Sequence, residues 1–250
     1  MLRINNIKIS ILNDNEEYLV KKLNKLLNTK VKIKNIVKKS LDARDKNNIL
    51  YVYEVNVLTK KIIKVKDKDI FEVKKEEYHV PFMGEEKLSY RPVVVGSGPC
   101  GLFATYILAE NGYKPLLIER GEKIEDRVKT VDEFWNTGKL NKESNVCFGE
   151  GGAGTFSDGK LNTLVDDKNS RIEKVFDIFI SCGAPKEIKY LNKPHIGTDV
   201  LRKVIKNMRE KIINLGGEVR YNSCLTDIFS INNKIDAIEV NNNEKINCDC

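Results

Sequence analysis

The spacing of apolar and polar positions divides residues 1–60 into short strands and one helix. Apolar and polar residues alternate over 2–12 and again around Val31 and Ile33, as they do on half-buried strands. Between these segments, Asp14 and Glu17 have the spacing of a capping box ahead of a helix. One face of that helix is apolar and comprises Leu19, Val20, Leu23, Leu26 and Leu27. With a further Tyr- and Val-rich strand over 49–58, the pattern predicts a small α+β domain.

Residues 91–119 show a different pattern, in which two short apolar runs flank a helical segment. The β-branched run 93–95 suits a strand that is buried on both faces of a parallel sheet. A glycine turn follows it, then a segment with one apolar helical face, and then a second apolar run over 115–118 that ends at Glu119. This order predicts an α/β fold, namely a Rossmann-like domain built from βαβ units with a parallel sheet.

The glycine turn has the spacing of a dinucleotide-binding fingerprint. Gly96 allows a tight bend, Gly98 lets the backbone approach a pyrophosphate, and Gly101 lets the helix pack close to the strand. Glu119 lies 23 positions after Gly96, where a carboxylate accepts hydrogen bonds from a ribose diol. An ordinary glycine turn is the alternative, but the flanking strand, helix and acid disfavour it. Arg120 raises the question of a 2′-phosphate, and the carboxylate of Glu119 argues against NADP in this half-site.

A second glycine-rich segment occupies 145–161. Its glycines fall within eleven positions and are Gly149, Gly151, Gly152, Gly154 and Gly159. Together with Thr155, such a segment can form a nest of amide donors close to a phosphate or an isoalloxazine ring. A flexible surface loop is the alternative, which the flanking Phe148 and Phe156 disfavour. Two glycine-rich segments about 50 residues apart fit a long cofactor such as FAD better than a single nucleotide half.

These segments resemble the uncharacterised FAD-dependent dehydrogenases of bacteria, within the NAD(P)/FAD-dependent oxidoreductases with two dinucleotide folds. The resemblance covers most of the chain and rests on three runs: RPVVVGSGPCGLFATYILAENGYKPLLIERG, NVCFGEGGAGTFSDGKLNT and YLNKPHIGTDVLRKVIKNMREKIINLGGEVRYNS. It extends more weakly to KKSLDARDK in a basic loop at 38–46. It implies an FAD-dependent oxidoreductase in which the flavin performs hydride or electron transfer, with NAD(P)H as a candidate electron donor.

The resemblance also implies a set of cofactor-binding residues. The pyrophosphate turn corresponds to Gly96, Ser97, Gly98, Pro99, Cys100 and Gly101, and the ribose acid to Glu119. Arg120 and Arg127 are candidate neighbours of a phosphate or the adenine, with a solvated helix face as the alternative. Candidate contacts in the second glycine-rich segment are Gly151, Gly152 and Thr155. The later strand that passes the adenine corresponds to 217–227, where Leu225 and Thr226 would offer backbone groups.

His195 is a weaker candidate for chemistry. It is one of two histidines and precedes a predicted helix. Near a flavin it could donate a proton or a hydrogen bond to the substrate, but a histidine hydrogen-bonded within a loop is the commoner case. The six cysteines form no CxxC pair, so neither a metal site nor a disulfide is predicted.

Charge and composition predict the domain organisation and the location. Residues 1–90 carry 20 Lys and Arg against 13 Asp and Glu, whereas residues 91–250 carry 23 of each sign. A compositional bias with solvated lysines explains this better than an RNA-binding surface, because no RNA-binding motif accompanies the charge. The prediction is a basic α+β domain at 1–80, a linker at 81–90 and the dinucleotide-binding domain at 91–250. No apolar run reaches the roughly 20 residues of a membrane span, and a cytoplasmic protein with reduced thiols is expected.

The known flavoproteins with two dinucleotide folds continue past the point that corresponds to residue 250, so the chain is expected to be an N-terminal fragment. Two other functions stay open beside the FAD-dependent oxidoreductase that uses a small-molecule substrate or electron donor. One is a flavin-linked protein that binds or modifies RNA through the basic domain. The other is a binder that senses a dinucleotide without turnover. The sequence indicates neither the substrate nor the oligomeric state.

Overall fold

The computed structural model describes residues 1–60, 67–74, 77–81, 84–157, 159–161, 167 and 169–250. The chain forms two compact units. The first consists of Met1–His79, Leu161–Phe176 and Lys186–Pro194, and the second of Val80–Lys160, Asp177–Pro185 and His195–Cys250. The domain limits expected from the sequence stay a prediction, and residues 82–83 of the expected linker lie outside the described residues.

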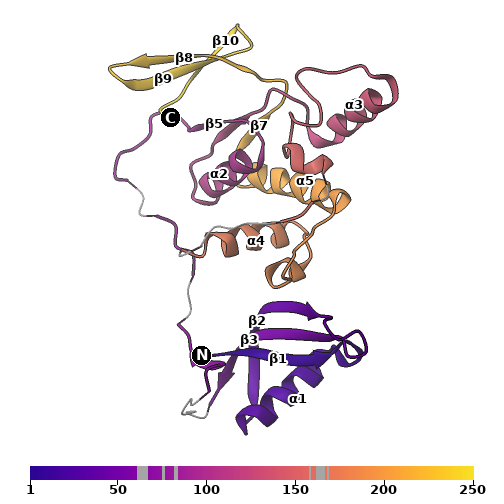
Figure 1. Ribbon diagram of the computed structural model, residues 1–250. Helices are drawn as coiled ribbons and strands as arrows, with labels where there is room; N and C mark the ends of the chain where they lie inside the picture. Colours follow the sequence, from indigo (N-terminus) through magenta and orange to yellow (C-terminus); the bar gives the residue numbers. More distant parts are fainter. Residues whose placement is uncertain (61–66, 75–76, 82–83, 158, 162–166, 168) are drawn as a thin grey trace. The chain divides into compact units, whose positions relative to one another are not determined.

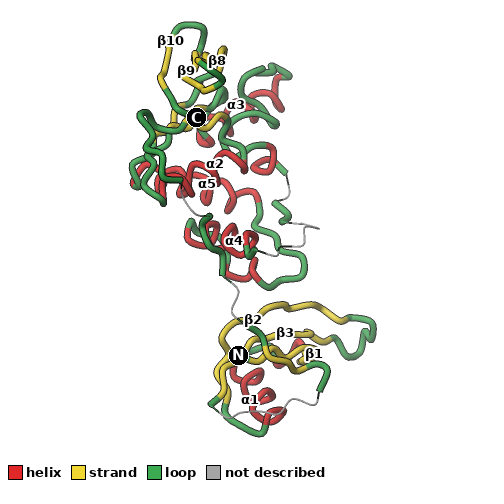
Figure 2. The backbone as a smooth tube through the Cα atoms, turned by 90° about the vertical axis from the view of Figure 1, so that its left-hand side faces the viewer, coloured by secondary structure: helices red, strands yellow, loops and turns green. Residues whose placement is uncertain are grey.

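The N-terminal part of the first unit is an antiparallel sheet with one helix. Its elements are β1 (Leu2–Ser10), the short 3-10 helix η1 (Ile11–Asn13), α1 (Glu16–Leu27), β2 (Val31–Asp42), β3 (Leu50–Thr59) and β4 (Ile70–Glu72). The sheet order is β2-β3-β1-β4. Figure 2 shows β1, β2 and β3 together with α1. Leu19, Leu23 and Leu27 of α1 are buried in one apolar cluster with residues of β1 and β3, whereas Leu26 is 48% exposed. The predicted α+β architecture is therefore present.

Two local predictions in this unit were wrong. The N-cap of α1 is Asn15, whose side chain accepts a hydrogen bond from the Tyr18 amide, and not Asp14. Asp14 instead accepts hydrogen bonds from the Lys39 ammonium and from the Tyr53 hydroxyl. Its carboxylate therefore makes tertiary contacts and does not cap the helix. Likewise the basic segment 38–46 is not entirely a loop, because β2 continues through Asp42 in pairing with β3.

The second unit contains a parallel sheet with helices, shown in Figure 1. Its elements are β5 (Val93–Val95), α2 (Pro99–Glu110), β6 (Leu116–Ile118), α3 (Ile124–Thr137), the 3-10 helix η2 (Ala153–Phe156), α5 (Thr198–Asn214) and β7 (Glu218–Arg220). The parallel order is β5-β6-β7. An antiparallel meander follows, made of β8 (Leu225–Ile231), β9 (Lys234–Val240) and β10 (Glu244–Asn247). Of the remaining elements, η3 (Lys186–Lys189) belongs to the first unit, and α4 (Arg171–Ser181) has residues in both units. This arrangement confirms the predicted α/β, Rossmann-like fold class.

The core of the second unit explains why β5 differs from the expectation for a strand buried on both faces. All three residues of β6 are fully buried, and Leu116 and Ile118 pack with residues of the meander. In β5, by contrast, Val95 is 54% exposed. Its side chain lies where β5 ends and a cavity begins, so the last position of the strand faces open space rather than the core.

The βαβ turn has the backbone geometry that its glycines predict. Gly96 adopts a φ of +90°, which favours glycine. A Cβ at Gly101 would lie 1.9 Å from the Gly96 carbonyl oxygen, so no other residue allows α2 to approach β5 this closely. Within the part of the chain that the structure describes, no helix is long and apolar enough to cross a membrane.

Candidate nucleotide-binding site

A cavity of about 440 Å³ lies beside the carboxyl ends of β5 and β6. Open α/β sheets bind ligands at this end of their strands. Four segments of the second unit line it. They contribute Val95, Gly96 and Gly98 after β5; Ile118, Glu119 and Arg120 after β6; Cys147, Phe148, Gly149 and Gly152 from the second glycine-rich segment; and Ser223, Cys224 and Leu225 after β7.

Gly98 presents bare backbone to this cavity. It is the N-cap of α2, with a φ of −66° and a ψ of 178°, a conformation open to any residue. A Cβ added there would meet no atom within 4 Å. The first turn of α2 has no side-chain cap, so its amide groups and the helix dipole are available to an anion.

Glu119 lines the cavity and is only 5% exposed. Its Oε2 accepts hydrogen bonds from the Ser97 amide at 2.7 Å and the Ser97 hydroxyl at 2.8 Å, and its Oε1 accepts one from the Gly121 amide at 2.8 Å. These bonds fix the orientation of the carboxylate. Because a carboxylate has about four acceptor positions, Glu119 keeps capacity for a further donor such as a ribose hydroxyl. Ser97 is fully buried and serves to hold Glu119.

The structure brings the two glycine-rich segments together. The Gly151 amide donates a hydrogen bond to the Ser97 carbonyl at 2.8 Å. A Cβ at Gly152 would lie 3.1 Å from the Pro99 side chain and 3.6 Å from the Cα of Gly98. Gly152 also has a φ of +65°. The second segment therefore packs against the first turn, at a position where the backbone conformation favours glycine and a Cβ would fit tightly against Pro99.

Arg127 has a different role from the predicted contact with a phosphate or adenine. It is fully buried and does not line the cavity. Its guanidinium donates to the carbonyls of residues 145, 146, 149, 150 and 152 and to the Thr155 hydroxyl, at 2.6–3.2 Å. Burial lowers the pKa of Arg127 to about 10, which leaves the group charged at neutral pH. Arg127 thus anchors the backbone of the second glycine-rich segment without lining the cavity.

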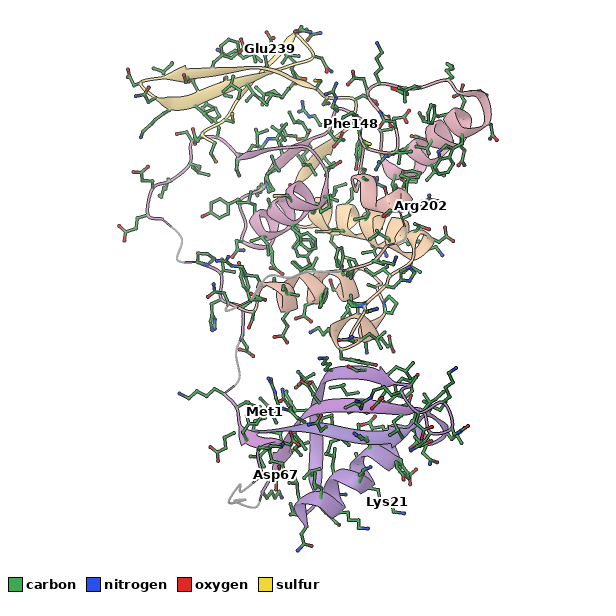
Figure 3. All side chains as sticks on the ribbon, viewed as in Figure 1. Met1, Lys21, Asp67, Phe148, Arg202 and Glu239 are labelled. Carbon is green, nitrogen blue, oxygen red and sulfur yellow. The ribbon has the colours of Figure 1, made fainter. Side chains whose placement is uncertain are left out.

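Thr155 and Phe156 continue this support. Thr155 is fully buried, and its hydroxyl donates to the Gly152 carbonyl at 2.8 Å. The Phe156 ring lies 4.7 Å from the guanidinium carbons of both Arg127 and Arg202. Arg202, labelled in Figure 3, reaches from α5 and donates to the Thr155 carbonyl at 3.1 Å. Thr155, a predicted cofactor contact, is placed in the support of the loop and not in the cavity lining.

Arg120 lines the cavity, and its role as a neighbour of the ligand stays a prediction. Its Nε donates to Glu143 Oε2 at 2.6 Å, and its guanidinium carbon lies 5.5 Å from the ring of Phe148. Phe148, also labelled in Figure 3, is 48% exposed. An exposed aromatic ring beside a guanidinium offers a stacking surface for a planar group such as a nucleobase.

Other predicted site residues lie beside the cavity or away from it. Leu225 lines it, whereas Pro99, Cys100 and Gly151 do not. The Thr226 hydroxyl donates to Glu239 and accepts from the Asn242 amide within the meander. His195 pairs through its backbone with Lys160 and is not a lining residue.

Sequence reasoning missed Cys147, Ser223 and Cys224, which line the cavity. For Ser223 and Cys224 the available signal is their position, because they lie three and four residues after β7, whose carboxyl end is at the same edge of the sheet as those of β5 and β6. In the described part of the chain, no three His, Cys, Asp or Glu side chains are arranged to hold a metal ion.

The two cavity cysteines provide a test of ligand occupancy. We expect a bound nucleotide to slow alkylation of Cys147 and Cys224 several-fold, because both thiols line the cavity that it would fill. Cys250, which is exposed and outside the cavity, is the internal control. Mass spectrometry of alkylated peptides measures the rate at each of the three cysteines with and without FAD. If bound FAD changes the rate at neither Cys147 nor Cys224, this cavity is not the FAD site.

Comparison with known proteins assigns the class of the second unit. Residues 94–145 match a family described as NAD(P)-binding Rossmann-like domain, and residues 1–58 match a domain of unknown function, DUF8436. The segment matched at 94–145 contains the βαβ turn and Glu119 and ends before the glycines of the second segment. The fold and the cavity therefore define a Rossmann-like nucleotide-binding unit.

Individual relatives extend this comparison. An uncharacterized protein of Clostridium beijerinckii is 48% identical over 255 residues, covering 99% of this chain and 47% of that protein. A digeranylgeranylglycerophospholipid reductase of Methanocaldococcus jannaschii is 33% identical over 106 residues, covering 39% of this chain and 27% of that protein. The crystal structure of THI4 from Thermovibrio ammonificans superposes with a TM-score of 0.37 at 16% identity, over 60% of this chain and 47% of that one. The chain thus spans about half the length of its C. beijerinckii relative.

Proposed function

We propose that the protein is an FAD-dependent oxidoreductase in which the second unit binds the adenosine diphosphate part of the cofactor. The observation that carries this proposal is the convergence of two glycine-rich segments on one cavity that also contains a fixed, buried carboxylate. A single nucleotide turn needs only the first of these segments, and the second adds a further wall of glycine backbone. The similarity of a 106-residue stretch to a reductase supports the same class of reaction.

We assign the groups of the adenosine diphosphate part to separate parts of the cavity. The amides at the start of α2, beside Gly98, would hold the pyrophosphate. Glu119 would accept hydrogen bonds from the ribose diol, and its negative charge disfavours a 2′-phosphate at the same place. The adenine would lie between Phe148 and the backbone of Leu225. Bound FAD supplies hydride or electron transfer, and the residues described here bind and orient it.

The reaction would need a small-molecule substrate and an electron donor, for which NAD(P)H is the candidate. We place the protein in the cytoplasm, because six free cysteines fit a reducing compartment.

The test is a visible absorption spectrum of the purified protein, followed by titration with FAD. Flavin absorption that co-purifies, or that shifts and saturates on titration at one FAD per chain, is the expected result. Addition of dithionite or NAD(P)H under anaerobic conditions then shows whether the bound flavin is reduced. A protein that takes up NAD or ADP but ignores FAD would point to a dinucleotide-sensing binder and against this proposal.

A further inference from the structure

Glu150 is an acidic residue within the second glycine-rich segment, and its side chain is fully buried. Its Oε2 accepts hydrogen bonds from the Ile124 amide and from Arg209 Nη1, each at 2.7 Å. Its Oε1 accepts one from the Tyr221 hydroxyl at 2.6 Å. The start of α3, the helix α5 and the residue after β7 thus converge on one carboxylate.

The bond between Glu150 and Tyr221 joins two walls of the cavity. Glu150 stands between Gly149 and Gly152, which form one wall, and Tyr221 precedes Ser223, Cys224 and Leu225, which form another. The two bonded residues are 71 positions apart in the sequence.

Backbone hydrogen bonds attach the segment after β7 to the residues that follow β6. The Asn222 amide donates to the Gly121 carbonyl at 3.1 Å, and the Ser223 amide donates to the Glu119 carbonyl at 2.8 Å. Both bonds attach the segment to the end of β6. The glycine-rich wall is bonded to the same region, because the Glu150 amide donates to the Glu122 carbonyl at 3.1 Å. A direct link between the two walls runs through the side chains of Tyr221 and Glu150, and Arg209 donates to that carboxylate as well.

The electrostatics keep this link intact near neutral pH. Burial raises the pKa of the Tyr221 hydroxyl, and the nearby charge of Glu150 raises it further, so Tyr221 stays protonated and donates. Burial also raises the pKa of Glu150, while the hydrogen bond from Tyr221 and the charge of Arg209 oppose that shift. Arg209 is in turn held by Glu125, at 2.6 Å and 3.1 Å.

We propose that Glu150 and Tyr221 are positioning residues, whose hydrogen bond sets the separation of the two cavity walls and thereby the affinity for the nucleotide. Neither side chain lines the cavity, so each acts through the backbone that follows or surrounds it. The effect on affinity rests on the function proposed above, whereas the mechanical link between the walls does not.

The experiment compares Tyr221→Phe with Tyr53→Phe. Both substitutions remove one hydroxyl that donates to a carboxylate, but Tyr53 donates to Asp14 in the first unit, so it is a matched control. We expect Tyr221→Phe to raise the Kd for FAD about 5- to 10-fold, the effect of one lost hydrogen bond. We also expect faster hydrogen–deuterium exchange at 145–152 and 222–225 in the ligand-free protein. Tyr53→Phe should change neither quantity.

The two readouts separate this inference from the proposed function. If the unsubstituted protein binds no FAD, the proposed function fails, and faster exchange in ligand-free Tyr221→Phe would still support the link between the walls. If FAD binds, an unchanged Kd for Tyr221→Phe overturns the positioning role, even where exchange rises. Unchanged exchange overturns the link itself.

Discussion

Gly98→Val should abolish tight binding of FAD while leaving the fold of the protein intact. The backbone angles at Gly98 suit valine, and a Cβ there meets no protein atom within 4 Å, so the substitution fits the ligand-free structure. The added methyl groups would fill the space that the proposed pyrophosphate needs. Overpacking costs up to about 3 kcal/mol, which corresponds to a roughly 100-fold rise in Kd. Titration of FAD, followed by absorbance, measures this change.

Two further glycines serve as controls for that experiment. Gly84 also has open space at its Cβ position but does not line the cavity, so Gly84→Val should leave the Kd for FAD unchanged. Gly101→Ala should destabilise the protein instead, because its Cβ would lie 1.9 Å from the Gly96 carbonyl oxygen. If Gly98→Val binds FAD as tightly as the unsubstituted protein does, the pyrophosphate does not lie at this turn.

Arg127→Met should lower the free energy of unfolding of the second unit by about 3–5 kcal/mol. The substitution keeps the apolar stem of the side chain but removes the guanidinium donor from five backbone carbonyls and the Thr155 hydroxyl. The carbonyls of Gly149 and Gly152 keep donors within the loop, whereas those of residues 145, 146 and 150 lose the donor that Arg127 supplies. Buried acceptors that lose a partner carry the full cost of their desolvation. Trp135 is the single tryptophan, and its ring packs edge-on against Phe156 at 6.2 Å. Its fluorescence during urea unfolding therefore reports on this loop.

A substitution on the same helix provides the control. The side chain of Lys129 is 78% exposed and makes only a surface ion pair with Asp126, at 3.1 Å. Lys129→Met should therefore change the free energy of unfolding by less than about 0.5 kcal/mol. Arg127→Lys should behave like Arg127→Met, since one ammonium has three donors and cannot reach six acceptors. Equal stability of the Arg127 and Lys129 variants would show that the guanidinium does not hold the loop.

The turn of the nucleotide-binding unit was predictable in detail, because its signals are local. Gly96 needs a positive φ and Gly101 needs close approach of a helix, and both requirements follow from residue spacing within one βαβ unit. Leu225 and Arg120 line the cavity, and the contacts with a ligand expected for them stay predictions. The capping box at Asp14 failed for the opposite reason, since Lys39 and Tyr53, distant in sequence, compete for that carboxylate.

The roles of the two buried charged residues that hold the second glycine-rich segment, Arg127 and Glu150, could not be predicted from the sequence. Arg127 looked like a phosphate ligand or a solvated helix residue, yet it is fully buried. Glu150 gave no signal at all, although three elements converge on it. A charge that is buried must be matched by partners, and the partners of both residues come from segments that only folding brings near.

The sequence by itself determined the α/β class, the βαβ turn with its glycines, and the acid at the end of β6. Strand and helix periodicities extend over only a few neighbouring residues, so they can be recognised from the sequence alone. The tertiary structure decided that the second glycine-rich segment packs against the first and that the segment after β7 lines the cavity with them. It also decided that the hydrogen bonds of Arg127 and Glu150 anchor the second segment. Those facts depend on contacts between residues 20 to 70 or more positions apart, whose formation depends on the packing of the whole unit.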